Sequence, residues 1–172
     1  LPPNQSFQRT RSGPLNSGVR RIQMETPHSE IHGSEALITA FGYWPHFHDA
    51  EVLEFNLSRG NLDPEAESWE FPCIHALIHV FEMTNEVNSG GFFALAKHHL
   101  VRFRFDGIDE LQLEGFNHQN VLYGLGINPI DNGPQRFQVL FDSAFGADAK
   151  FNCQAISITE VLPCTAKGSP CA

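Results

Sequence analysis

The sequence predicts an α+β fold, in which an N-terminal helix packs on a curved, mainly antiparallel sheet of about seven strands. Three observations support this: a helical apolar pattern over residues 31–40, alternation of apolar and polar residues in seven later segments, and turns rich in Gly, Asn and Pro between them. Strands joined by short turns pair antiparallel. A flattened barrel or sandwich with a capping helix fits equally well, because periodicity does not separate the two.

The elements follow in order along the chain. Thr26 and Ser29 are candidate N-caps of the helix, and Gly42 is a suitable C-terminal stop. Pro45 prevents the helix from continuing, and the apolar period changes to two over residues 51–57. The remaining strands are expected at residues 71–83, 97–105, 108–116, 121–127, 137–141 and 151–162, the last with a bulge near Ala155.

Composition divides the chain into three parts. Residues 1–23 are rich in Pro, Gly, Ser, Gln, Asn and Arg and contain few apolar residues, so we expect a disordered or non-native leader and a native start at Met24. Residues 24–162 are expected to form one domain, which is long enough to bury a sizeable core. Residues 163–172 are expected to form a flexible tail.

The charge is distributed unevenly. Residues 1–23 contain four Arg and no acidic residue, which leaves seven basic and 20 acidic residues, a net charge of −13, in the rest of the chain. Such a body should repel nucleic acid and attract basic proteins, although an acidic surface also serves solubility alone. The sequence contains no run of about 18 apolar residues, so we expect no membrane span.

Four cysteines, at positions 73, 153, 164 and 171, show no zinc-type C-x-x-C spacing. Cys73 and Cys153 lie in apolar, strand-like runs and are expected to be buried thiols. The first residues lack the apolar segment of a secretory signal. We therefore expect reduced thiols in a cytoplasmic protein.

An aromatic and polar segment, WPHFHDAE, lies at the predicted junction of helix and first strand. It contains Trp44, Pro45, Phe47, His48, Asp49 and Glu51. We expect Trp44 and Phe47 to be core or half-buried anchors, and the Asp49 carboxylate to accept hydrogen bonds from backbone amides of the turn. On an extended backbone, the side chains of His48 and Asp49 should point in opposite directions.

A second polar segment, EGFNHQN, contains Glu114, Gly115, Phe116, Asn117, His118, Gln119 and Asn120. Its amide and imidazole groups can close a turn by binding the backbone, or they can form a recognition surface. We favour the structural interpretation, in which Asn117 and Asn120 tie a corner between strands and His118 packs against the aromatic residues near Trp44. In this interpretation the second segment is the partner of His48 and Asp49.

Together with RFQVLFDSAFG (136–146), these two segments resemble the motifs of the immunity protein 50 family of bacterial polymorphic-toxin systems, in the same order and spacing over about residues 31–161. The resemblance implies a non-enzymatic protein without a cofactor. It implies a protein that protects the producing cell by binding and occluding a cognate toxin domain.

Two other functions remain open. The nine histidines allow a small metal-binding or hydrolytic domain centred on His48, Asp49 and His118, because imidazole and carboxylate groups bind zinc. This requires the second segment to fold beside the first. The sequence contains no G-x-S-x-G, H-E-x-x-H or paired Cys/His motif, so we expect no catalytic or metal-binding residue. The third possibility is a structural interaction module unrelated to toxins.

An acidic segment between the first two predicted strands contains the candidate contacts with a partner, Glu65, Glu67, Trp69 and Glu70. An aromatic side chain surrounded by carboxylates suits the centre of an interface with a basic protein. The alternative is that Trp69 folds back and holds the loop in place.

Overall fold

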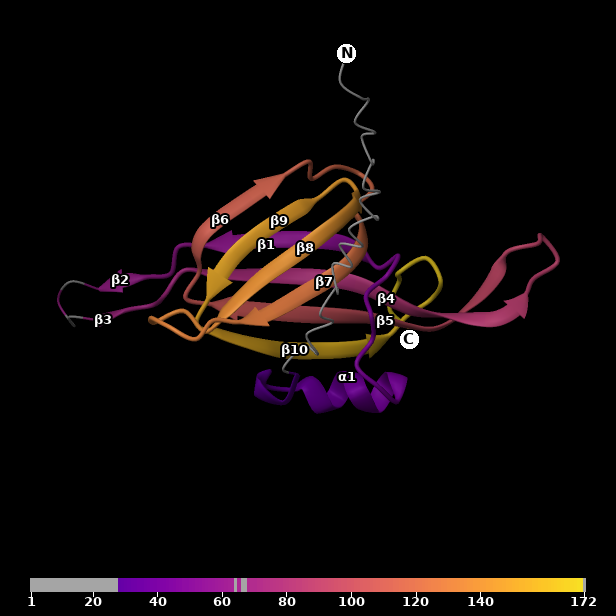
Figure 1. Ribbon diagram of the computed structural model, residues 1–172, viewed down its shortest axis with the longest axis horizontal. Helices are drawn as coiled ribbons and strands as arrows, with labels where there is room; N and C mark the ends of the chain where they lie inside the picture. The colour runs from indigo at the N-terminus through magenta and orange to yellow at the C-terminus, as the bar shows by residue number, and fades with distance from the viewer. Residues whose placement is uncertain (1–27, 64, 66–67, 172) are drawn as a thin grey trace, which may run out of the picture.

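One α-helix and a large antiparallel sheet form the part of the chain that the computed structural model describes, residues 28–63, 65 and 68–171 (Figure 1). The predicted leader, Met24 and Thr26 lie outside these residues. The helix α1 spans Ser34–Phe41 and follows a short 3-10 turn at His28–Glu30. No helix within the described ranges has the length and hydrophobicity needed to cross a membrane.

Eight strands make up the main sheet, in the order β10-β5-β4-β1-β7-β8-β9-β6. All neighbouring strands are antiparallel, and the sheet is not closed, because the two end strands do not pair. The α+β class and the mainly antiparallel sheet agree with the prediction. The strands are β1 (Glu51–Ser58), β4 (Cys73–Val87), β5 (Phe93–Asp106), β6 (Asp109–Glu114), β7 (Val121–Pro129), β8 (Phe137–Phe145), β9 (Asp148–Cys153) and β10 (Ala155–Pro163).

The sheet folds over on itself into two layers whose strands cross at an angle (Figure 1). One layer contains β1, β4, β5 and β10, and the other contains β6, β7, β8 and β9; Glu51 and Val121 form the one residue pair that joins β1 to β7. Between the layers, the Phe105 ring lies edge to face with Phe141 and Phe151, at centroid distances of 6.0 and 5.1 Å. Burial of apolar side chains such as these is the dominant favourable contribution to folding.

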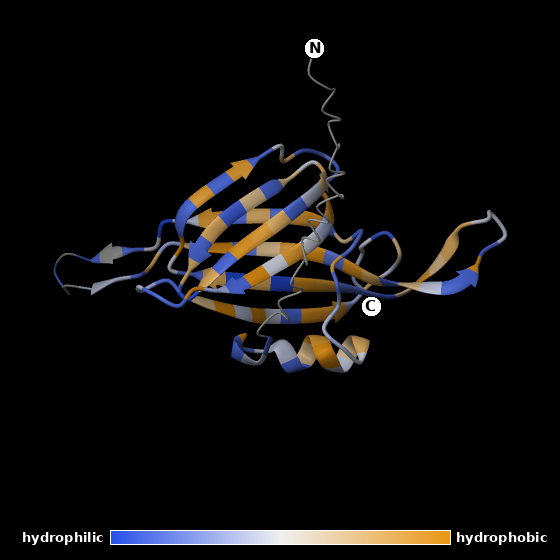
Figure 2. Ribbon diagram, viewed as in Figure 1, coloured by the Kyte–Doolittle hydropathy of each residue, from blue (hydrophilic) through white to orange (hydrophobic). Residues whose placement is uncertain are grey.

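Hydrophobic and hydrophilic residues alternate along β8 and β9 (Figure 2), which leaves one face of each strand in the core and the other in solvent. The layered packing shares a feature with the alternative sandwich prediction, although the strands remain in one continuous sheet. The sheet therefore positions an apolar inner face and a polar outer face on the second layer.

The number of strands differs from the predicted seven. The phase change near Ala155 is a boundary between β9 and β10, which lie in different layers, and not a bulge within one strand. A two-stranded hairpin of β2 (Leu62–Asp63) and β3 (Ser68–Trp69) occupies the predicted loop. β4 and β5 also extend further than expected and project from the body as a long hairpin (Figure 1). In β1, an irregularity between Val52 and Glu54 leaves Leu53 exposed rather than in the core.

The helix packs beside the edge strand β10, and Leu37 and Phe41 are its buried apolar side chains. It is shorter than predicted, because Ser29 lies in the 3-10 turn and Gly33 precedes the first helical residue. A Cβ on Gly33 would lie 2.4 Å from the Ile158 carbonyl oxygen, so a glycine is needed where the chain passes this close to β10. As predicted, Gly42 ends the helix, and its N–H donates to the Ile38 carbonyl.

Residues 163–171 fold back over the outer face of the first layer. The Cys164 N–H donates to the His98 carbonyl at 2.9 Å, and Cys164 packs in a small second cluster with Leu77 and Leu100. Beside this cluster, His79 is 5% exposed and its Nε2 lies 3.0 Å from Nδ1 of His98. Cys73 and Cys153 are buried, as predicted.

The His79–His98 pair predicts that stability falls in mild acid. Burial lowers the pKa of both imidazoles, and the neighbouring histidine lowers each further, His98 acting on His79 and His99 on His98. An unfolded histidine has a pKa of about 6.5, so the unfolded chain takes up protons first as the pH falls. The free energy of unfolding should therefore be fully retained above about pH 6.5 and decrease below it.

Urea unfolding at about pH 7.5 and about pH 5.5 measures this loss, because the protonation of carboxylates changes little in that range. His98→Gln removes one of the two titrating imidazoles, so the free energy of unfolding of this variant should depend less on pH. An equal pH dependence in the wild-type protein and the variant would contradict the assignment.

Candidate functional site

The segment WPHFHDAE (residues 44–51), called the first motif below, forms a tight corner between α1 and β1. Phe47 and Asp49 have φ of 55° and 61°, in the left-handed region that non-glycine residues rarely adopt. The Ala50 N–H donates to the Phe47 carbonyl across the corner. Because the backbone is not extended, Nδ1 of His48 lies 3.0 Å from Oδ2 of Asp49, and the prediction that these two side chains diverge is wrong.

Aromatic packing anchors this corner to the core. Phe47 is buried and lies edge to face with Phe103 of β5, with the ring centroids 5.8 Å apart. Trp44 is half-buried and contacts Phe47 on one side, while His28 stacks on it at 5.8 Å. The aromatic residues of the first motif are therefore anchors, as predicted, and they fix the corner against both the helix side and the sheet.

Asn120 joins the segment EGFNHQN (residues 114–120), called the second motif below, to the first motif. Its side chain is 4% exposed, and Oδ1 accepts hydrogen bonds from the N–H groups of Asn117 (2.9 Å) and Ala147 (3.1 Å). Its Nδ2 donates to the carbonyls of Val52 (3.2 Å) and Asn117 (2.8 Å). The whole hydrogen-bonding capacity of the carboxamide is therefore used, and three separate segments meet on one side chain.

The two motifs lie side by side, as expected, but backbone groups join them and not the side chains of His48 and Asp49. The Asp49 N–H donates to the Leu122 carbonyl, and the Leu122 N–H donates to the Ala50 carbonyl, each at 2.9 Å. Within the described part of the chain, the Asp49 carboxylate contacts His48 and accepts no hydrogen bond from a backbone amide, so its predicted role is wrong. His118 is exposed and contacts no ring among the described residues, so its predicted packing near Trp44 is also wrong.

We expect Asp49→Ala to lower the free energy of unfolding by about 1–2 kcal/mol, because alanine tolerates a left-handed backbone poorly. Asp49→Gly removes the carboxylate and keeps the backbone conformation, so it should lose much less. Urea unfolding of both variants measures the difference. If the glycine variant is destabilised as much as the alanine variant, the carboxylate itself carries the stability.

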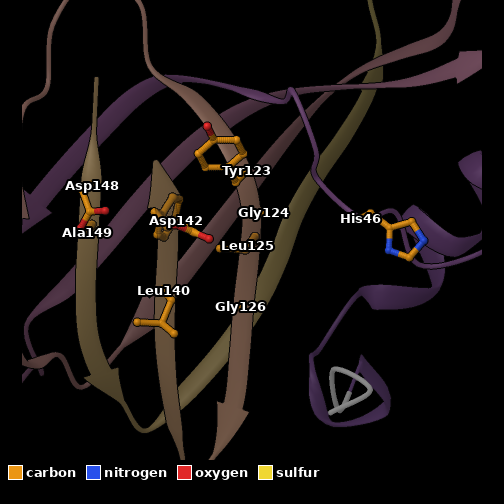
Figure 3. Close-up of a pocket in the computed structure, with 10 residues that line it drawn as sticks. His46, Tyr123, Gly124, Leu125, Gly126, Leu140, Asp142, Asp148 and Ala149 are labelled. Carbon is orange, nitrogen blue, oxygen red and sulfur yellow. The ribbon is translucent and has the colours of Figure 1, made fainter. Parts of the chain in front are cut away.

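Beside the corner, a shallow pocket of about 370 Å³ opens on the outer face of the second layer (Figure 3). Residues of β7, β8 and β9 line it together with His46 of the first motif: Tyr123, Gly124, Leu125, Gly126, Leu140, Phe141, Asp142, Asp148 and Ala149. Figure 3 shows the Asp142 carboxylate directed toward β7, with the Tyr123 ring on the same side of the pocket. The centroid of this ring lies 6.4 Å from that of His48, which connects the pocket to the first motif.

The sequence prediction missed this pocket. Its two carboxylates come from different strands and meet only through strand register. The detectable signal was the pattern Gly-Leu-Gly at residues 124–126, since glycines at alternate positions of a strand mark a place where another group approaches closely.

The structure does not assemble the metal-binding or hydrolytic alternative. No group of three or more His, Cys, Asp or Glu side chains among residues 28–63, 65 and 68–171 is placed to hold a metal ion. His48 and Asp49 form a pair, but neither forms a hydrogen bond with a hydroxyl or thiol group in these ranges, and His118 forms no hydrogen bond with them.

Trp69, one of the predicted partner contacts, lies on β3 of the β2–β3 hairpin, at the opposite end of the molecule from the β4–β5 hairpin (Figure 1). Trp69 is 65% exposed and its ring contacts no other described ring, so the observed side chain points to solvent. The Glu70 carboxylate accepts from the Asn61 N–H at 3.3 Å, and Glu65 is exposed. Glu67 lies outside the described residues.

Comparison with known proteins gives one match. A family model described as immunity protein 50 matches residues 33–164, which include α1, the whole main sheet, both motifs and the pocket. No curated protein and no solved structure matches the chain.

Proposed function

Because this chain belongs to the immunity protein 50 family, we propose that it binds a cognate toxin domain of a polymorphic-toxin system and neutralises it. The family match is the observation that carries the proposal. In this role the protein acts in the cytoplasm of the bacterial cell that makes the toxin, where it prevents self-poisoning, and it needs no cofactor.

We propose that neutralisation is stoichiometric occlusion and not catalysis. The His48–Asp49 pair lacks a neighbouring nucleophile or a third metal ligand among the described residues, which gives catalysis little support. The protein would instead cover the active site or substrate groove of the toxin. Such binding requires exposed anchors on a rigid scaffold, which the sheet provides.

The net charge of −13 outside residues 1–23 favours a basic toxin, such as a nuclease. Complementary charge accelerates encounter and disfavours wrong partners. The same charge makes nucleic acid and anionic membrane surfaces poor partners for this protein.

We place one contact with the toxin on the β2–β3 hairpin. Trp69 is exposed there between the acidic residues Glu65 and Glu70, and Glu67 lies close in sequence. An exposed tryptophan flanked by carboxylates can insert into a basic surface, with the charges surrounding the apolar contact.

Co-expression tests the proposal. The toxin domain encoded beside this gene should stop growth when expressed alone, and this chain should restore growth. Trp69→Ala should weaken binding to the purified toxin roughly tenfold or more while leaving urea unfolding unchanged, because Trp is typical of interface hot spots. Leu162→Ala, a change of another exposed apolar residue on β10, is the control. Growth arrest that this chain never relieves would contradict the proposed function.

A further inference from the structure

The floor of the pocket in Figure 3 is made by Gly124 and Gly126 of β7. Strand register places them directly opposite Asp142 and Leu140 of β8. Neither glycine has a φ in the left-handed region, so the backbone accepts any L-residue at these positions. Because glycine weakens a strand interior, these two residues point to a need for space and not for a turn.

A Cβ would fit at both positions and would take up space in the pocket. A Cβ on Gly126 would lie 3.4 Å from Cβ of Leu140, and a Cβ on Gly124 would lie 3.7 Å from the His46 carbonyl oxygen. These are ordinary contact distances, so folding does not forbid side chains here. The pocket is open because both side chains are missing.

Two carboxylates stand next to each other at this pocket. Phe141 pairs with Ala149 across β8 and β9, which makes Asp142 and Asp148 cross-strand neighbours on the outer face. Like charges in this arrangement destabilise a sheet. Neither carboxylate forms an ion pair or a side-chain hydrogen bond within the described part of the chain, even with Lys150 on the same face of β9.

The remaining wall suits an organic cation. The Tyr123 side chain is 59% exposed, and an aromatic ring attracts a cation placed over its face. Leu140 and the glycine floor offer apolar contact for an aliphatic stem, while the carboxylates lie at the rim. A divalent metal ion finds no third His, Cys, Asp or Glu ligand here among the described residues.

We propose that this pocket receives an arginine side chain of the partner, with the guanidinium group at the Asp142 carboxylate, beside Tyr123, and with the charge of Asp148 on the neighbouring strand adding to the attraction. A planar guanidinium can bind two carboxylates through several N–H donors and can also stack on an aromatic ring. The compact ammonium group of lysine lacks this planar set of donors. The identity of the partner as a toxin rests on the proposed function. The preference of the pocket for arginine does not, and it is measurable without the toxin.

The probe is N-acetyl-arginine methylamide, titrated into the ¹⁵N-labelled full chain and followed by NMR. The amide signals of Gly124, Gly126 and Tyr123 should shift and saturate in the millimolar range. The citrulline derivative, a neutral isostere, should leave them unchanged. Gly126→Val, which fills the floor, and Asp142→Asn should each weaken binding roughly tenfold or more, whereas Asp131→Asn in the exposed β7–β8 turn should not.

Equal shifts from the arginine and citrulline derivatives, or an unchanged affinity in both Gly126→Val and Asp142→Asn, would overturn the proposal. Asp142→Asn keeps the test decisive if the valine variant does not fold. If the toxin binds the chain but the arginine derivative causes no shift at the pocket, this inference is wrong and the proposed function stands. If the pocket binds the arginine derivative but the chain never protects against the toxin, the preference of the pocket for arginine stands and the proposed function is wrong.

Discussion

Asn120→Ala should lower the free energy of unfolding by about 3–5 kcal/mol, the largest effect expected of a polar substitution in this protein. The change leaves the N–H of Ala147 and the carbonyl of Val52 without their side-chain partner at a buried site. Each unpaired buried group costs about 1–3 kcal/mol. Urea unfolding at neutral pH measures the loss.

Asn117→Ala is the matched control for this prediction. Asn117 is exposed, and among the described residues its side chain bonds only to Gly115 and Gln119 in its own loop, so its removal should cost about 1 kcal/mol. Equal losses in the two variants would show that Asn120 does not hold the motifs together. Protection against the toxin should fall in Asn120→Ala as the folded fraction falls.

Gly146→Ala should lower the free energy of unfolding by about 3 kcal/mol or more, through strain and overlap together. Gly146 has φ +82°, and an added Cβ would lie 2.2 Å from the Gln119 carbonyl oxygen and 2.7 Å from Oδ1 of Asn120. Backbone atoms of the second motif would therefore have to move. Urea unfolding again gives the magnitude.

Gly91→Ala separates the two causes. Gly91 also has φ +82°, but a Cβ there meets nothing within 4 Å, so the variant carries the conformational strain without the overlap. Its loss should be about 1–2 kcal/mol. If both variants lose the same stability, the junction between residues 119–120 and 146 is more adaptable than its packing indicates.

The corner and its partner segment could be predicted from the sequence, because aromatic residues, a proline and a block of amides are local signals. Asn117 and Asn120 were expected to tie a corner between strands, and Asn120 does join separate segments through its carboxamide, whereas the Asn117 side chain bonds within its own loop. The role of Asp49 was mispredicted, because an extended backbone was assumed. The left-handed conformations of Phe47 and Asp49 depend on packing with β5 and β7, which local sequence does not encode.

Alternation predicted most strands, but it could not show which strands share a layer. The apolar alternation changes phase near Ala155, where the partner of the chain changes from β8 to β5, so two strands resembled one strand with a bulge. The pocket was missed for a related reason. Asp142 and Asp148 are six residues apart in sequence, and only the pairing of β8 with β9 makes them neighbours.

The central claim is that this chain neutralises a toxin by covering it. The direct measurement is a titration of the purified toxin domain with purified chain, in which complex formation and residual toxin activity are recorded on the same samples. Occlusion predicts a one-to-one complex and toxin activity that falls in proportion to the bound fraction, reaching zero at about one equivalent. Toxin activity that disappears at a small fraction of an equivalent, or without a complex, would contradict it and indicate catalysis instead.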